Sequence, residues 1–240
     1  KGIEFLMKKN KIKVFEGIAS FINANSISVD NKGNIQTINS KYYIIATGAR
    51  ARDFPSVETD GEFVLSYKQA MILTQIPKRM AIIGAGAIGV EFAHIYNTFG
   101  TDVTLIESLP NILPIEDKDI SIELEKQYKK RNISLLTNVK VENIEVKDGI
   151  VETKLNDGKI IKTDKVLIAI GVKANTELLN LNKNNLIVEN GWIKVNEYMQ
   201  TNVKNIYAIG DVAGPPWLAH VASKQGMIAS EHLSGLKPEP

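Results

Sequence analysis

The feature that most constrains the fold of this sequence is residues 80–107, where two apolar runs flank a glycine-rich turn and a helical segment. The first run, MAII, leads to glycines at positions 84, 86 and 89, and the second run, VTLI, ends in Glu107. This order predicts a strand, a tight turn, a helix and a second strand, which is the unit that binds dinucleotides in doubly wound α/β sheets.

Each glycine has a physical role in such a unit. Gly84 permits the tight turn, Gly86 lets the backbone approach a pyrophosphate, and Gly89 lets the helix lie close to the strand. The free N–H groups and the dipole of the helix N-terminus then favour the anion. A carboxylate at Glu107 can accept hydrogen bonds from a ribose and would repel a 2′-phosphate, so the sequence favours NAD over NADP.

The composition excludes several other classes of protein. The 240 residues include 29 Lys and Arg against 27 Asp and Glu, and this balance argues weakly against a nucleic-acid surface. No apolar run approaches the ~18 residues that span a bilayer. Cysteine is absent and the 3 histidines lack metal-ligand spacing, so we expect no disulfide, no metal site and, by default, a cytoplasmic protein.

The remaining pattern predicts strands, helices and three glycine-terminated strand ends. We expect helices at 66–74, 117–131 and 218–233, and strands at 12–16, 26–29, 35–38, 41–46, 133–136, 139–146, 150–155, 159–162, 165–170 and 206–209, with a short extended segment at 191–195. Glycines at 48, 171 and 210 follow buried strands. Since ligands of doubly wound sheets bind at the carboxyl ends of strands, each of these glycines is a candidate ligand contact.

Two acidic residues are further candidates, and the residues alone leave an alternative open for each. Glu91 lies in the first turns of the predicted helix, where it is either a helix-dipole acid or a contact to the nicotinamide end of a cofactor. Asp211 follows a buried strand and precedes a helix, so it is either a helix cap or a carboxylate bonded to polyol hydroxyls.

Five motifs, in this order, resemble those of the flavoprotein disulfide reductases with two dinucleotide-binding domains. They are ATGAR (46–50), GAGAIGVE (84–91), VTLIE (103–107), AIGVKAN (169–175) and TNVKNIYAIGDVAG (201–214). Within the family, GPPWLAHVASKQG (214–226) is most similar to the dihydrolipoamide dehydrogenases. AIGVKAN departs from the commoner Gly-Arg-x-Pro-Asn form at Val172 and Ala174.

The resemblance implies an α/β fold with a Rossmann-like NAD-binding domain, a parallel sheet plus a β-meander, inserted in a partial FAD-binding domain. The implied ranges are 1–68 for the second, β-rich part of the FAD-binding domain, 69–198 for the NAD-binding domain and 199–240 for the return segment of the FAD-binding domain.

The resemblance also assigns cofactor contacts. Those for NAD are Gly84, Ala85, Gly86, Ala87, Ile88, Gly89, Glu91, Glu107, Val141, Ala169, Ile170, Gly171 and Val172. Those for FAD are Ala19, Thr47, Gly48, Ala49, Gly210, Asp211 and Ala219. No residue of this chain is expected to be catalytic, because the family's Cys-x4-Cys pair and its His-Glu pair are absent, as is its first glycine fingerprint for FAD.

The implied activity belongs to a longer enzyme, of which this chain is interpreted as an internal fragment. That enzyme oxidises protein-bound dihydrolipoamide with FAD and reduces NAD⁺. Its partners are the lipoyl domain of a 2-oxo-acid dehydrogenase or glycine cleavage complex and a second copy of itself, with no nucleic acid and no membrane. From the chain alone we expect weak NAD binding, no stable FAD and no activity. An NADH oxidase, a mercuric or glutathione reductase, or a stand-alone NAD-binding module stay open as alternatives.

Overall fold

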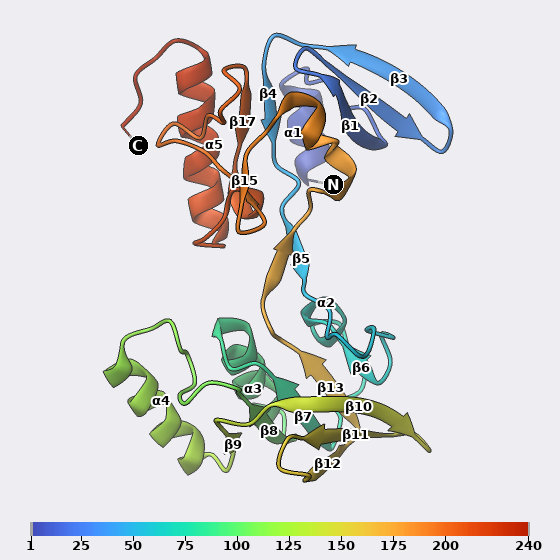
Figure 1. The fold of residues 1–240 in the computed structure, drawn as a ribbon, viewed down its shortest axis with the longest axis vertical. Coiled ribbons are helices and arrows are strands. Elements are labelled where there is room, and N and C mark those ends of the chain that lie inside the picture. The colour runs from blue at the N-terminus through green and yellow to red at the C-terminus, as the bar shows by residue number, and fades with distance from the viewer. Residues whose placement is uncertain (1, 240) are drawn as a thin grey trace. The chain divides into compact units, whose positions relative to one another are not determined.

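The chain divides into two compact units (Figure 1). The computed structural model describes residues 2–239. One unit consists of Lys1–Arg50 together with Ala174–Pro240, and the other is the continuous segment Ala51–Lys173. The sequence motifs place domain limits elsewhere, at 68/69 and 198/199, and those ranges stay a prediction.

The unit of residues 51–173 is built on a five-stranded sheet in the order β6-β13-β7-β8-β9. Every strand pair in this sheet is parallel. The strands are β6 (Val64–Leu65), β7 (Arg79–Ile83), β8 (Asp102–Ile106), β9 (Ser134–Leu136) and β13 (Lys165–Ile168). From β7 the chain proceeds through β8 to β9 on one side and returns to β13 on the other. The carboxyl ends of β7 and β13 are therefore the topological switch point, where doubly wound sheets bind ligands.

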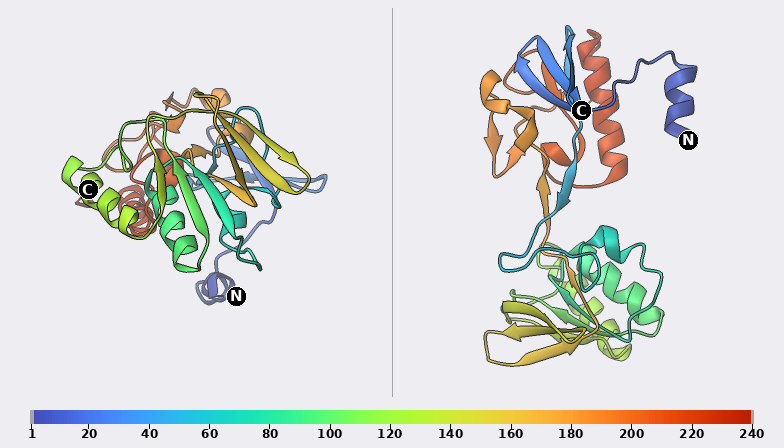
Figure 2. Two further views of the ribbon diagram at one scale, coloured as in Figure 1. Left: turned by 90° about the horizontal axis from the view of Figure 1, so that it is seen from below. Right: turned by 90° about the vertical axis from the view of Figure 1, so that its right-hand side faces the viewer.

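Both faces of this sheet are buried, which explains its continuous apolar strands. Met80 and Ile82 pack in a cluster with residues of α2 (Tyr67–Ala70), α3 (Ala87–Thr98) and α4 (Lys118–Lys130). Ala81 and Ile83 point to the opposite cluster, which contains residues of the antiparallel meander. Figure 2 shows α3 and the meander on opposite sides of the sheet.

The meander consists of β10 (Val141–Lys147), β11 (Ile150–Leu155) and β12 (Ile160–Thr163) in a three-stranded antiparallel sheet. Asp148 and Gly149 both have positive φ, 49° and 76°, as a two-residue hairpin turn of type I′ requires. The expected combination of a parallel sheet and a β-meander is confirmed.

The other unit combines small sheets with one long helix. Its elements are α1 (Gly2–Lys9), β1 (Ile18–Asn23), β2 (Ser26–Asn31), β3 (Asn34–Asn39), β4 (Tyr43–Ile45), η1 (Glu177–Leu179), η2 (Leu181–Asn184), β15 (Val188–Glu189), β16 (Trp192–Ile193), β17 (Ile206–Ala208), η3 (Gly210–Ala213) and α5 (Ala219–Leu233). β1, β2 and β3 form an antiparallel sheet, whereas β4 and β17 pair in parallel. β5 (Ala49–Ala51) and β14 (Val172–Ala174), the strands at the unit boundaries, pair with each other.

Two local expectations were wrong, and one helix was not expected. Residues 12–16 form no strand, because Ile12 and Val14 lie exposed with no partner strand beside them. The helix expected at 66–74 is limited to α2, a single turn opened by a capping box in which Gln69 accepts from the Ser66 N–H. Helix α1 was not expected, and it contains no buried residue. None of the helices in residues 2–239 is both long and apolar enough to cross a membrane.

Candidate functional site

The glycine turn after β7 lies between the ends of β8 and β13. The Gly84 N–H donates to the Ile106 carbonyl at 2.8 Å, and the Ala169 N–H donates to the Ile83 carbonyl at 2.8 Å. Gly84 has φ +97°, and a Cβ there would lie 2.5 Å from the Ala169 carbonyl oxygen. Only glycine fits this position, for conformational and steric reasons together.

The other two fingerprint glycines differ sharply from each other. A Cβ on Gly89 would lie 1.9 Å from the Gly84 carbonyl oxygen, so α3 touches the turn backbone to backbone. A Cβ on Gly86, the N-cap of α3, would meet no atom within 4 Å. The absence of a side chain at Gly86 therefore serves no contact within the protein, whereas it would serve the close approach of a ligand to the helix N-terminus.

Glu107, at the end of β8, holds the same turn. Its side chain is 8% exposed, and Oε2 accepts a hydrogen bond from the Ala85 N–H at 2.8 Å. Oε1 accepts from the Leu109 N–H at 2.9 Å and from the Ser108 hydroxyl at 3.1 Å. The Leu113 N–H donates to the Ala85 carbonyl at 2.7 Å. A carboxylate has about four acceptor positions, so three protein donors leave Glu107 capacity for a ribose hydroxyl.

Two buried tyrosines anchor α3 to its neighbours. The Tyr96 hydroxyl donates to the Ala70 carbonyl at 2.5 Å, and the Tyr128 hydroxyl of α4 donates to the Val90 carbonyl at 2.6 Å. Burial raises the pKa of both phenols, which are protonated donors at neutral pH even at the ordinary pKa of a tyrosine. The helix that begins at the glycine turn is thus fixed along its length.

The remaining predicted NAD contacts vary in exposure. Glu91 is exposed on α3 and has no hydrogen-bond or ion-pair partner among residues 2–239. Ala87 is exposed, Ile88, Val141, Ile170, Gly171 and Val172 are half-buried, and Ala169 is buried. Both alternatives for Glu91, dipole acid and cofactor contact, are compatible with its position in the second turn of α3.

In the other unit, two predicted FAD contacts with positive φ follow neighbouring parallel strands. Gly48 (φ +66°) comes after β4 and Gly210 (φ +69°) directly opens η3 after β17. Since β4 and β17 are parallel, the two turns leave the same edge. The Gly210 N–H donates to Gln225 Oε1 of α5 at 2.7 Å. The half-buried carboxylate of Asp211 has no hydrogen-bond or ion-pair partner among residues 2–239.

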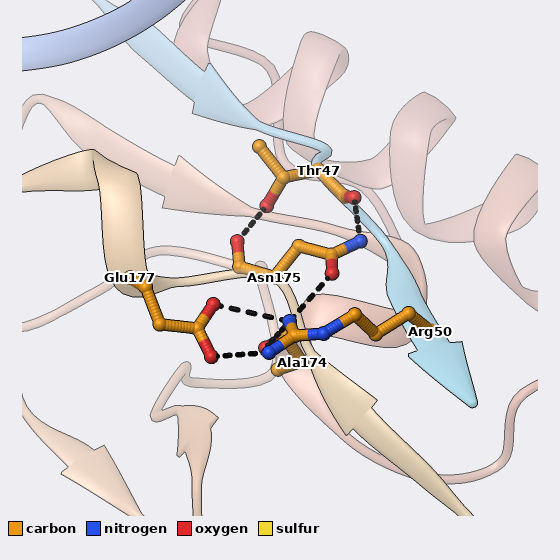
Figure 3. Close-up of polar contacts among 5 residues, drawn as sticks. All are labelled: Thr47, Arg50, Ala174, Asn175 and Glu177. Carbon is orange, nitrogen blue, oxygen red and sulfur yellow. Dashed lines mark hydrogen bonds and ion pairs between the residues drawn. The ribbon is translucent and has the colours of Figure 1, made fainter. Parts of the chain in front are cut away.

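A polar cluster fixes the segment that contains Gly48 (Figure 3). Asn175 Nδ2 donates to the Thr47 carbonyl at 2.9 Å, and Thr47 Oγ1 donates to the Asn175 carbonyl at 2.8 Å. Arg50 donates to Asn175 Oδ1 at 2.9 Å and forms a forked ion pair with Glu177 at 2.6 and 3.1 Å. Sequence reasoning did not single out Asn175, although the motif at 169–175 ends with it.

Two other predicted FAD contacts are exposed. Ala219 is the first residue of α5, after the N-cap Leu218, and Ala19 lies in β1. The predicted contacts divide between the two units. All those for NAD lie in the unit of residues 51–173, and all those for FAD lie in the other unit. Within residues 2–239 no group of three or more acidic, histidine or cysteine side chains is arranged to hold a metal.

The residues present fit the two groups that the motifs imply. The open space at Gly86, beside crowded glycines at 84 and 89, matches a pyrophosphate at the N-terminus of α3. On the other unit, the open space at Gly48 and the carboxylate of Asp211, unpaired within residues 2–239, match a ligand with hydroxyl donors.

Comparison with known families decides which proteins this chain is related to. The family described as pyridine nucleotide-disulphide oxidoreductase matches residues 1–226. The chain belongs to this family. Members of the family that match it include a dihydrolipoyl dehydrogenase of Zymomonas mobilis, 40% identical over 98% of this chain, and one of Mycobacterium bovis, 43% identical over 98% of this chain. In both cases the chain spans 51% of the relative, about half its length.

A solved structure supports the same grouping. The crystal structure of LpdA from Mycobacterium tuberculosis superposes with a TM-score of 0.93 at 28% identity, covering 100% of this chain and 54% of that one. The pyridine nucleotide-disulphide oxidoreductase fold therefore extends over the whole chain, with the glycine turn of residues 84–89 in its parallel-sheet unit.

Proposed function

We propose that this chain is the central section of a dihydrolipoyl dehydrogenase, which oxidises protein-bound dihydrolipoamide and reduces NAD⁺. The relatives named dihydrolipoyl dehydrogenase support this proposal. The observation that carries it is the glycine turn at the switch point of the parallel sheet, with Gly86 open and Glu107 fixed beside it. In this proposal residues 69–198 act as the NAD-binding domain, and 1–68 and 199–240 are parts of the FAD-binding domain.

The NAD side would work through backbone groups and one carboxylate. The N-terminus of α3 would hold the pyrophosphate, with Gly86 allowing close approach. Glu107 would accept the adenosine ribose hydroxyls and disfavour a 2′-phosphate. Val141 and residues 169–172 would line the same site, and Glu91 would lie near the nicotinamide.

The FAD side would use the turns after β4 and β17. Thr47, Gly48 and Ala49 would contact the flavin nucleotide, and Asp211 would accept hydrogen bonds from its ribityl hydroxyls. Ala219, at the N-terminus of α5, would offer its N–H near the flavin pyrimidine, where the helix dipole favours negative charge. Ala19 and Gly210 would complete these contacts.

Flavin and nicotinamide, when bound, supply hydride transfer, and this chain's residues bind and orient them. We assign no catalytic residue to this chain, because the 240 residues contain no cysteine. The dithiol-disulfide chemistry would need cysteines outside the sequence printed here.

The proposed partners follow from the proposed substrate. A dihydrolipoyl group is carried by the lipoyl domain of a 2-oxo-acid dehydrogenase or glycine cleavage complex, and the full enzyme would be a homodimer. The cytoplasm is the proposed compartment. Pull-down of a purified lipoylated domain by the full-length gene product, with an unlipoylated domain as control, tests the partner.

Titration calorimetry of the 240-residue chain with NAD⁺, NADH and NADP⁺ tests the proposed cofactor. We expect weak binding of NAD⁺ and NADH, and weaker binding of NADP⁺ because of Glu107. Absence of heat with NADH at millimolar concentration would contradict the proposal for the glycine turn. Stoichiometric flavin absorbance in the purified chain would contradict the expectation that the chain alone retains no FAD.

A further inference from the structure

Asn175 uses every polar group of its backbone and side chain to hold residues 47–50. Its backbone N–H donates to the Gly48 carbonyl at 3.0 Å, and its backbone carbonyl accepts from the Thr47 hydroxyl at 2.8 Å. Its side-chain Nδ2 donates to the Thr47 carbonyl at 2.9 Å, and Oδ1 accepts from Arg50 at 2.9 Å. Figure 3 shows Asn175 between Thr47 and Arg50.

The segment held in this way contains a glycine that would otherwise be free to move. Gly48 has φ +66°, and a Cβ there would meet no atom within 4 Å. Glycine populates positive and negative φ about equally, so the residue itself does not select the observed conformation. The Gly48 N–H has no hydrogen-bond partner among residues 2–239. The bonds from Asn175 to both flanks, together with the paired strands β4 and β5 on either side, restrict this turn.

The ion pair beside Asn175 contributes much less to this restriction. The side chains of Arg50 and Glu177 are 38% and 45% exposed, and exposed ion pairs stabilise proteins weakly. Arg50, two residues after Gly48, donates to Asn175 Oδ1, whereas Asn175 Nδ2 bonds to the Thr47 carbonyl directly beside Gly48. The amide of Asn175, rather than the charge of Glu177, is therefore the deciding group.

We propose that Asn175 is a positioning residue for the cofactor turn, which holds Thr47 and Gly48 in the conformation that receives FAD. The proposal rests on the proposed function, in which Thr47, Gly48 and Ala49 contact FAD. A turn that is ordered before binding loses less conformational entropy when the ligand arrives, so Asn175 raises FAD affinity without touching FAD.

The first test measures the mobility of the turn in the 240-residue chain without any cofactor. In Asn175→Asp the size and the Oδ1 acceptor are kept, but the donor to the Thr47 carbonyl becomes a repelling oxygen. We expect the ¹⁵N order parameter of the Gly48 amide to fall from about 0.85 to below about 0.6. The order parameters of the amides in β2 should not change. Glu177→Gln is the matched control and should leave Gly48 ordered.

A second pair of variants keeps the test decisive where Asn175→Asp fails to fold. Thr47→Val removes the hydroxyl that donates to the Asn175 carbonyl and keeps the side-chain shape. Thr47→Ser keeps that hydroxyl. We expect mobility at Gly48 in Thr47→Val and restored order in Thr47→Ser, because the hydrogen bond and not the methyl group fixes the turn.

The second test measures FAD affinity in the full-length product of the gene. We expect Asn175→Asp to weaken FAD binding about tenfold, with Glu177→Gln within about twofold of the wild type. An ordered Gly48 in Asn175→Asp, or a mobile Gly48 with unchanged FAD affinity, would overturn the positioning role. If the wild-type product takes up no FAD, the proposed function fails, whereas the relaxation measurements still decide whether Asn175 orders the turn.

Discussion

The two units fix their glycine turns by different physical means. In the unit of residues 51–173, backbone crowds backbone: a Cβ on Gly84 or Gly89 would lie 2.5 or 1.9 Å from a carbonyl oxygen. In the other unit, Gly48 stands in open space, and side-chain amides hold the backbone: Asn175 bonds to the segment around Gly48 and Gln225 bonds to Gly210. The first turn tolerates no added atom at Gly84 or Gly89, whereas the second depends on hydrogen bonds that a distant substitution can remove.

The largest effect should come from adding one methyl group at Gly89. In Gly89→Ala the new Cβ would overlap the Gly84 carbonyl oxygen, and this overlap outweighs the roughly 1 kcal/mol by which alanine favours a helix. We expect the unfolding free energy of the unit of residues 51–173 to fall by about 3 kcal/mol or more. Denaturant unfolding followed by circular dichroism measures it, and an unchanged midpoint would show that α3 does not touch the turn.

The same substitution at Gly86 should separate binding from stability. A Cβ on Gly86 meets nothing within 4 Å, and the residue's φ of −72° is open to alanine. In Gly86→Ala we expect an unfolding midpoint close to the wild type and NADH affinity weakened roughly tenfold or more, because the methyl group would occupy the approach to the helix N-terminus. Titration calorimetry beside thermal unfolding checks both. Unchanged NADH affinity would show that the pyrophosphate does not bind at this position.

In the other unit, Gly48→Ala should lower the unfolding free energy only by the strain of the backbone conformation. Alanine at φ +66° lowers the unfolding free energy by about 1 kcal/mol, and no steric clash adds to this loss. Gly48→Asn should lose less, since asparagine tolerates this region. Gly33→Ala, at φ +90° in the turn between β2 and β3, is the matched control with the same kind of strain and no role in binding. If Gly48→Ala lowered the unfolding free energy as much as is expected for Gly89→Ala, the Gly48 turn would be sterically crowded.

This contrast also explains what could be predicted from the sequence. The crowded turn is encoded within six residues, 84–89, so spacing alone reveals it. The helices α4 and α5 and the meander likewise follow from local periodicity and turn residues. The bonds from Asn175 to Thr47 join residues 128 positions apart, and no local pattern indicates them. The strand predicted at residues 12–16 is absent for a similar reason. A local pattern predicts a strand only where a partner strand exists elsewhere in the chain.

An effect no larger than that of Gly48→Ala is expected from a pH dependence in the unit of residues 51–173, whose strand β7 begins at an ion pair. Arg79 donates to Asp164 through its backbone N–H at 2.9 Å and its guanidinium at 2.7 Å. Burial alone would raise the pKa of Asp164, but these hydrogen bonds and the Arg79 charge outweigh it and lower the pKa. A carboxyl with a lowered folded-state pKa stabilises the fold above its unfolded pKa, and that stability is lost as the pH falls through the folded value.

We therefore compare the wild type with Asp164→Asn by denaturant unfolding from pH 7 down to pH 3. The wild type should be more stable at pH 7 by about 1 kcal/mol, because the pair is partly exposed and therefore screened. The difference should shrink below about pH 4, near the ordinary pKa of an aspartate. Glu142→Gln, which removes an exposed ion pair with Lys154, should show little difference at any pH. A difference between wild type and Asp164→Asn that stays constant with pH would show that the Arg79–Asp164 contact acts through shape rather than charge.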